Sequence, residues 1–164
     1  MFLIDFLNRQ KIQAHWVEAI VFDFDGVFTN NKVIVDENGK ESVICNRADG
    51  LGIKMLRAKN IPMLILSTEA NLVVKMRAQK LNLEVFQGIA DKKEALLKLS
   101  KEKNINLKNT IYVGNDINDF EAMKMVGFPI APKDANPSIL RIAKYITKSK
   151  GGEGVIRELA DIIK

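Results

Sequence analysis

The segment from Ala19 to Gly26 constrains the fold more than any other part of the sequence. Four apolar residues lead to Asp23, and a single phenylalanine separates it from Asp25 and Gly26. An apolar run that ends in carboxylates and a glycine predicts a buried strand whose C-terminal end opens into a polar loop. Paired carboxylates in so apolar a segment need compensation, which favours a functional pair over a solvated strand end. A turn at Gly26 would let both reach one hard cation such as Mg²⁺.

Strand-like and helix-like segments alternate along the chain. Short apolar runs predict strands at residues 19–22, 62–66, 84–86, 110–113 and 128–131. Apolar residues at roughly helical spacing predict helices at residues 51–59, 71–81, 91–103, 120–126, 137–144 and 155–163. This alternation favours an α/β fold, a Rossmann-like doubly wound parallel sheet covered on both faces. One domain is expected at 18–164, after a helical lead-in at 1–17.

A hairpin is expected directly behind the two aspartates. Asn38 and Gly39 separate β-branched runs at 32–35 and 41–45, and Asn-Gly in that position is a strong hairpin signal. The residues leave two interpretations open, a flap over the aspartates or a plain structural hairpin. A polar, glycine-containing loop is expected to follow at 46–50.

Composition excludes several classes of protein. The chain has 164 residues, enough for one domain with a full core, and its formal charge of +5 is spread along helix-like segments. We read these charges as solvated faces rather than a nucleic-acid surface. No apolar run approaches membrane-spanning length, and the start lacks the order of a signal peptide. The single cysteine, Cys45, cannot form an internal disulfide, which suits a reducing cytoplasm.

Polar residues gather where several predicted strands end. Because the C-terminal ends of parallel strands meet at one edge of a sheet, these residues should share a cleft. They are Asp23 and Asp25, Ser67 and Thr68, and Asn115 and Asp116. Lys92 joins the set on a different argument: it lies in the first turn of a helix, where a positive charge is out of place.

This set of residues suits phosphoryl transfer. Asp23 would attack phosphorus and form an aspartyl-phosphate. Asp25 would protonate the leaving oxygen and then activate water. Ser67 and Lys92 would hold phosphate oxygens beside Mg²⁺. The sequence has no Walker-type loop, so it does not indicate a P-loop nucleoside triphosphatase.

Taken together and in order, these motifs resemble those of the haloacid dehalogenase superfamily, from residue 18 to the end. The hairpin in place of a large cap domain, the 46–50 loop and Gly151–Gly154 resemble its capless sugar-acid phosphatases, which act on 3-deoxy-2-keto sugar acid phosphates. A similar domain is fused to some acylneuraminate cytidylyltransferases. The resemblance implies a homotetramer in which a neighbouring subunit closes each site, with Gly151–Gly154 as a closing element.

The resemblance also implies substrate-binding and metal-binding residues. The expected substrate-binding residues are Thr29, Asn46, Arg47, Asp49, Thr68, Glu69, Lys80 and Arg157. Those expected at the Mg²⁺ are Asp23, Asp25, Asn115, Asp116 and Asp119. Asn115 departs from the family, which has aspartate there, so Asp116 or Asp119 is expected to compensate.

The segment after the second motif bears on the choice of sugar acid. The eight-carbon enzymes typically have Thr-Gly-Arg there, whereas this chain has Ser67-Thr68-Glu69. Glu69 followed by Lys80 resembles the nine-carbon group, and a glutamate could accept hydrogen bonds from sugar hydroxyls. We therefore expect a nonulosonate 9-phosphate of the sialic acid or KDN type, with 3-deoxy-octulosonate 8-phosphate as the alternative.

Two other classes of protein fit parts of the pattern. A non-catalytic tetramerisation module associated with a cytidylyltransferase would explain Asn115. It would not explain two clustered carboxylates kept together with Lys92, so we favour the enzyme. A receiver domain has a similar acidic pocket and lysine, but Asp-x-Asp-Gly directly after the first strand fits a phosphatase better.

Overall fold

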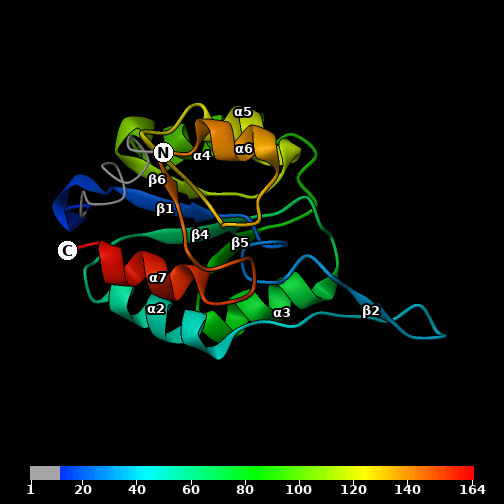
Figure 1. Cartoon of the computed structure of the whole chain (residues 1–164). Helices are drawn as coiled ribbons and strands as arrows, with labels where there is room; N and C mark the ends of the chain where they lie inside the picture. Colours follow the sequence, from blue (N-terminus) through cyan, green and yellow to red (C-terminus); the bar gives the residue numbers. More distant parts are fainter. Residues whose placement is uncertain (1–11) are drawn as a thin grey trace.

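The computed structural model describes residues 12–164, and a six-stranded sheet forms its centre (Figure 1). Each neighbouring pair of strands is parallel. In spatial order the strands are β5 (Glu84–Phe86), β4 (Met63–Leu66), β1 (Ala19–Phe22), β6 (Thr110–Val113), β7 (Phe128–Ala131) and β8 (Tyr145–Ile146). The strand order reverses at β1, and ligands of doubly wound sheets bind beside that point.

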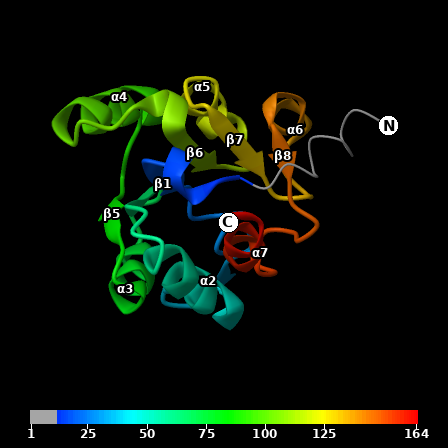
Figure 2. The same ribbon diagram turned by 90° about the vertical axis from the view of Figure 1, so that its left-hand side faces the viewer.

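Helices cover both faces of the sheet and make a three-layer molecule (Figures 1 and 2). One face carries α4 (Lys92–Glu102), α5 (Phe120–Met123) and α6 (Pro137–Ile142). The other carries α2 (Arg47–Arg57), α3 (Leu72–Leu81) and α7 (Val155–Ile162). Two 3₁₀ turns, η2 (Leu107–Asn109) and η3 (Ile117–Asp119), precede β6 and α5. The predicted α/β fold with a doubly wound parallel sheet is confirmed.

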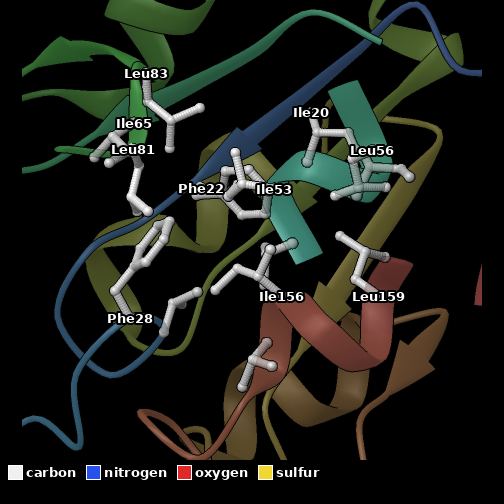
Figure 3. Close-up of a cluster of buried hydrophobic side chains, with 14 of the residues drawn as sticks. Ile20, Phe22, Phe28, Ile53, Leu56, Ile65, Leu81, Leu83, Ile156 and Leu159 are labelled. Atoms are coloured by element: carbon white, nitrogen blue, oxygen red, sulfur yellow. The ribbon is translucent and has the colours of Figure 1, made fainter. Parts of the chain in front are cut away.

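Alternate residues of β1 contribute to separate cores on its two faces. Ile20 and Phe22 belong to the core beneath α2 and α7, whereas Val21 belongs to the core beneath α4 and α5. A strand of a parallel sheet is buried on both faces, which is why all four residues of β1 are apolar. Figure 3 shows how closely α2 and α7 pack. Their side chains meet over β1: Ile53, Leu56, Ile156 and Leu159.

Helix α2 begins at Arg47, within the segment that the sequence predicts to be a loop. Asn46 starts it as the N-cap, because its side chain accepts a hydrogen bond of 2.8 Å from the backbone N–H of Ala48. A Cβ at Gly52 would lie 2.7 Å from the carbonyl oxygen of Ile156. The glycine lets α2 and α7 approach at the backbone, and this packing outweighs its weak helix propensity.

The predicted hairpin is formed by β2 (Ile34–Val35) and β3 (Glu41–Ser42). Asp36 stabilises its turn by accepting hydrogen bonds from the N–H groups of Asn38 and Lys40, and Gly39 supplies a φ of 76°. The hairpin projects away from the body of the molecule (Figure 1). The interpretation as a flap over this chain's own aspartates is therefore not supported.

The remaining differences from prediction lie at the chain ends and in short elements. Residues 1–11 of the expected helical lead-in lie outside the described residues, and the part that follows contains only the 3₁₀ turn η1 (Ala14–Trp16). Strand β8, an edge strand of two residues, is too short for its pattern to predict. Within residues 12–164, no helix has the length and apolar character that crossing a membrane requires.

Candidate active site

The C-terminal ends of three central strands lie level with one another. In the sheet register Phe22 of β1 pairs with Ile65 of β4 and with Val113 of β6. Asp23, Ser67 and Gly114 follow these strand ends directly, or within two residues. The register therefore brings the predicted motifs into one cleft.

The floor of this cleft is a charge network centred on Lys92, in which Asp23 lines the cleft while Lys92 and Asp119 are buried beneath it. The Lys92 Nζ lies 2.7 Å from Asp23 Oδ1 and 2.7 Å from Asp119 Oδ1, and its side chain is fully buried. The Asp23 Oδ1 also accepts a hydrogen bond of 2.7 Å from the backbone N–H of Phe24. Burial, and next the charge of Asp119, raise the pKa of Asp23, while Lys92 opposes this rise. Lys92 thus orients Asp23 and favours its ionised form.

Both oxygens of Asp119 are engaged within the protein. Its Oδ1 accepts from Lys92 and from the hydroxyl of Tyr112 at 2.9 Å. Its Oδ2 accepts from the backbone N–H of Asn115 at 3.0 Å and more weakly from that of Asp116. These bonds fix the loop after β6. They leave Asp119 positioned to hold Lys92, so the structure does not support the prediction of Asp119 as a metal ligand.

Asp25 lies at the half-buried edge of the cleft. Its Oδ1 accepts a hydrogen bond of 3.1 Å from the hydroxyl of Thr29. Burial raises the pKa of Asp25, and the Thr29 hydrogen bond opposes that rise. A carboxyl with a raised pKa holds its proton more readily than an ordinary aspartate, which favours a role as a general acid. Thr29 was predicted to bind substrate, but it is fully buried and supports Asp25 instead.

The cleft has a volume of about 280 Å³, and its rim is polar and exposed. Its lining residues are Asp23, Asp25, Asn31, Val33, Ser67, Thr68, Glu69, Asn115, Asp116 and Asn118. Ser67 is buried and accepts a hydrogen bond from the N–H of Glu69, which leaves its hydroxyl hydrogen free to donate. Thr68 and Glu69 lie on the rim, as the prediction of substrate contacts requires.

Oxygen donors suited to a hard cation face this cleft. Asp23, Asp25, Asn115 and Asp116 all line it. A side chain at Gly26 would overlap the amide of Asn115, so the glycine gives Asn115 its place beside the aspartates. Among residues 12–164, no three His, Cys, Asp or Glu side chains converge on one point. The donor set fits Mg²⁺, but it depends on the neutral amide oxygen of Asn115.

Two of the predicted substrate-binding residues serve the fold. The side chain of Asn46 caps α2, and its carbonyl oxygen accepts a hydrogen bond from Arg77. Asp49 is fully buried and accepts hydrogen bonds from the backbone of α7. Neither residue lines the cleft, because the loop predicted to carry them is in fact the start of a helix.

Three basic residues predicted to bind substrate also lie outside the cleft. Arg47 and Lys80 line a separate cavity of about 620 Å³ between α2 and α3. Arg157 forms an ion pair of 3.1 Å with Asp161 on its own helix. Sequence reasoning missed Arg77, which lines the same cavity. No sequence feature distinguishes Arg77 from the other basic residues of its helix.

Comparisons with known proteins extend over nearly the whole chain. Residues 57–159 match the family model described as haloacid dehalogenase-like hydrolase. The chain is 31% identical over 152 residues to the 3-deoxy-D-manno-octulosonate 8-phosphate phosphatase of Salmonella typhi, covering 92% of this chain and 81% of that protein. A Streptomyces avermitilis protein provisionally assigned to the HAD family superposes with a TM-score of 0.90 at 43% identity, covering 92% and 87% of the two chains.

A further solved structure is relevant because of what it contains. The 3-deoxy-D-manno-octulosonate 8-phosphate phosphatase of Moraxella catarrhalis, in complex with a magnesium ion, a phosphate ion and a KDO molecule, superposes with a TM-score of 0.87 at 28% identity. It covers 96% of this chain and 90% of that chain. Motif order, strand register and these matches agree. The chain belongs to the haloacid dehalogenase-like hydrolases.

Proposed function

We propose that this enzyme is a Mg²⁺-dependent phosphatase that hydrolyses the phosphate monoester of a 3-deoxy-2-keto sugar acid. One observation carries the proposal. Lys92 is buried in the cleft floor and holds Asp23 at 2.7 Å, while Asp25 lies at the edge of the same cleft. A nucleophile fixed beside a second carboxyl with a raised pKa is the arrangement that two-step phosphoryl transfer requires.

In the first step, Asp23 attacks phosphorus and forms an aspartyl-phosphate. Lys92 and the Ser67 hydroxyl hold oxygens of the phosphoryl group, and Asp25 gives its proton to the departing alkoxide. In the second step, Asp25 takes a proton from a water molecule that attacks phosphorus. This step releases inorganic phosphate and regenerates Asp23. Asp25 is thereby restored to its starting form.

Mg²⁺ bound by the side chains of Asp23, Asn115 and Asp116 and by the backbone carbonyl oxygen of Asp25 would offset the negative charge of the phosphate in this site, and this would leave the Asp25 carboxyl free for proton transfer. Two features of the cleft support this assignment. Its donors are oxygens, and burial together with like charge raises the pKa of Asp23. A nearby cation would relieve that unfavourable electrostatic environment.

The eight-carbon substrate now has more support than the nine-carbon substrate that the sequence favoured. Two of the three relatives named above are phosphatases of 3-deoxy-D-manno-octulosonate 8-phosphate, and none of the three is named for a nine-carbon sugar acid. Glu69 remains the one observation in favour of a nonulosonate 9-phosphate. It lies exposed on the rim, but its Oε1 already accepts hydrogen bonds from the N–H groups of Ala70 and Asn71. We therefore propose 3-deoxy-octulosonate 8-phosphate first.

A second copy of the chain is proposed to complete the site. The hairpin and its flanks expose four apolar side chains in an arrangement that a monomer does not need: Val33, Ile34, Val35 and Ile44. Val33 also lines the cleft, so a partner covering this hairpin would reach the substrate. Arg47, Lys80 and Arg157 are proposed to act across such a contact in a homotetramer. The cytoplasmic location and the absence of nucleic-acid binding stay predictions.

One assay tests the proposal: phosphate release from eight-carbon, nine-carbon and generic phosphate esters, with and without Mg²⁺. We expect Mg²⁺-dependent release, fastest from 3-deoxy-octulosonate 8-phosphate. Faster release from the nine-carbon ester would restore the choice made from Glu69. A tetramer inactive on every ester would instead support the non-catalytic module.

A further inference from the structure

Asp49 is a buried carboxylate that the mechanism above does not use. It lies in the first turn of α2 and is fully buried. Its Oδ1 accepts hydrogen bonds of 3.0 Å and 3.3 Å from the backbone N–H groups of Ile156 and Arg157, more than 100 residues later in the chain. Its Oδ2 is buried and has no hydrogen-bond partner among the described residues. Such a group needs an explanation.

Helix α7 depends on this carboxylate for its N-terminal cap. The residue at its N-cap is Gly154, which has no side chain to accept the free N–H groups of the first turn. Asp49 accepts two of them from a neighbouring helix, and a negative charge is favourable at a helix N-terminus. In Figure 3, Ile156 at this end of α7 lies among side chains of the shared core. Asp49 therefore fixes where α7 starts.

The segment directly before α7 packs on the loop that follows the nucleophile. The backbone N–H of Gly152 donates to the carbonyl oxygen of Val27 at 3.1 Å. A Cβ at Gly151 would overlap the carbonyl oxygen of Gly26, and one at Gly152 would lie 2.6 Å from the N atom of Asn30. Gly151 and Gly152, the first half of the Gly151–Gly154 segment, thus lie backbone to backbone against residues 26–30 of their own chain.

Residues 26–30 in turn hold Asp25. The Thr29 hydroxyl accepts hydrogen bonds of 3.2 Å from the N–H groups of Gly26 and Asn31, and donates one of 3.1 Å to Asp25 Oδ1. Each step from Asp49 to Asp25 is a direct contact. Any shift of Gly151–Gly154 therefore reaches Asp25 through Thr29.

We propose that Asp49 is a positioning residue for Asp25, acting through the start of α7, the Gly151–Gly154 segment and Thr29. This inference rests on the proposed function, because it assumes that Asp25 transfers protons in phosphate-ester hydrolysis.

Electrostatics support a dedicated role for Asp49. Burial raises its pKa to about 6, while the hydrogen bonds from Arg157 and Ile156 and the charge of Arg77 oppose that rise. Burial raises the pKa of the nearby Cys45 thiol, and the charge of Asp49 adds to that rise. The fold keeps a carboxylate in an unfavourable place, which is more typical of functional parts of a protein than of ordinary packing.

The experiment compares three variants with the wild type on two esters. Asp49→Ala removes the acceptor, Asp49→Asn keeps an oxygen in its place, and Gly152→Ala disrupts the same route at a second point. The control is Glu18→Ala. Glu18 also accepts a hydrogen bond from the backbone N–H of a distant residue, Asn106, at 2.9 Å. It directly precedes β1, however, at the end of the strand away from the cleft. The esters are 3-deoxy-octulosonate 8-phosphate and para-nitrophenyl phosphate, and the rate of the first turnover is measured by rapid quench.

We expect Asp49→Ala and Gly152→Ala to slow the first turnover of the sugar-acid ester by roughly tenfold or more, because a small displacement of a catalytic group has a large effect on rate. KM should stay within about twofold, because ground-state binding is untouched. The rate of the first turnover of the nitrophenyl ester should fall less, because its leaving group does not need the proton of Asp25. Asp49→Asn should retain most of the rate, and Glu18→Ala all of it.

Amide hydrogen exchange at Ile156, Arg157 and Gly152 provides a readout independent of activity. It should speed up in Asp49→Ala and not in Glu18→Ala. An active wild type whose two esters slow equally in Asp49→Ala, or do not slow at all, would overturn the positioning role alone. A wild type inactive on both esters would overturn the proposed function and this inference together. If Asp49→Ala does not fold, the same comparison is made with Gly152→Ala and Asp49→Asn.

Discussion

The floor and the rim of the cleft are built in opposite ways. On the floor, Asp23, Lys92 and Asp119 are buried and hold one another by short ion pairs. On the rim, Thr68 and Glu69 are exposed, and the hydrogen bonds of Glu69 go to its own neighbouring backbone. The floor is therefore preorganised by buried ion pairs within one chain, whereas the side chains of the rim are held by exposed hydrogen bonds that water can replace.

This difference separates chemistry from substrate choice. Substituting a buried group whose hydrogen bonds are all made should lower the reaction rate strongly, because its buried partners are left unsatisfied. An exposed group changes preference more than rate, because water replaces the contacts it loses. Four substitutions test whether floor residues control the rate and rim residues control substrate preference. They are given in order of decreasing expected effect.

The largest effect is expected for Asp23→Asn. The variant keeps the size of the side chain and removes the nucleophile, so turnover should fall by roughly 10⁴-fold or more. Phosphate release measures the loss, and a thermal melt shows that the fold is retained. Residual turnover within about tenfold of wild type would mean that Asp23 is not the nucleophile.

Lys92→Met should affect both rate and stability. Removing the ammonium leaves two buried carboxylates facing each other, which should lower the free energy of unfolding by about 3 kcal/mol. Loss of a phosphate-holding donor should lower kcat by roughly 10²-fold. The matched control is Lys93→Met, the exposed neighbour in the same helix turn. Equal effects of the two variants would contradict the buried network.

Asn115→Asp tests the neutral ligand of the proposed metal site, which lines the cleft beside the aspartates. A carboxylate in place of the amide should lower the Mg²⁺ concentration for half-maximal activity by roughly threefold to tenfold, because ligand charge tunes affinity for a hard cation. A Mg²⁺ titration of activity, together with calorimetry of Mg²⁺ binding, measures the change. An unchanged Mg²⁺ requirement would mean that Asn115 is not a ligand.

The smallest effect on rate is expected for Glu69→Arg. With a generic ester, kcat should stay within about twofold, because this rim residue touches no reacting atom. Preference should move toward the eight-carbon acid, because Glu69 can accept hydrogen bonds from the hydroxyls of the longer sugar chain, whereas an arginine side chain has no acceptor. Competition between the eight-carbon and nine-carbon esters measures the shift. An unchanged preference would remove Glu69 from substrate selection.

The floor of the site could be predicted from the sequence because strand ends align by rule. Asp23, Asp25 and Ser67 follow buried runs, and parallel pairing brings such positions to one edge. Lys92 could be predicted because its charge conflicts with its place at a helix start. In each case a local pattern carried the information.

The supporting residues could not be predicted in the same way. Thr29 and Asp49 were expected to bind substrate because the family resemblance implied it. Their actual partners, Asp25 in one case and the start of α7 in the other, depend on how distant parts of the chain pack. The role of Gly52 was missed in the same way, because its close contact with α7 is visible only in the folded structure.

The most direct test of the account is to find the phosphoryl group on the protein. Wild type and Asp25→Asn are mixed with para-nitrophenyl phosphate and Mg²⁺, quenched in acid within one turnover, and mapped by peptide mass spectrometry. One phosphoryl group is expected on Asp23, and it should accumulate further in Asp25→Asn because hydrolysis of the aspartyl-phosphate needs that carboxyl. Burst release of nitrophenol with no phosphoryl group on Asp23, or with one on another residue, would contradict this mechanism.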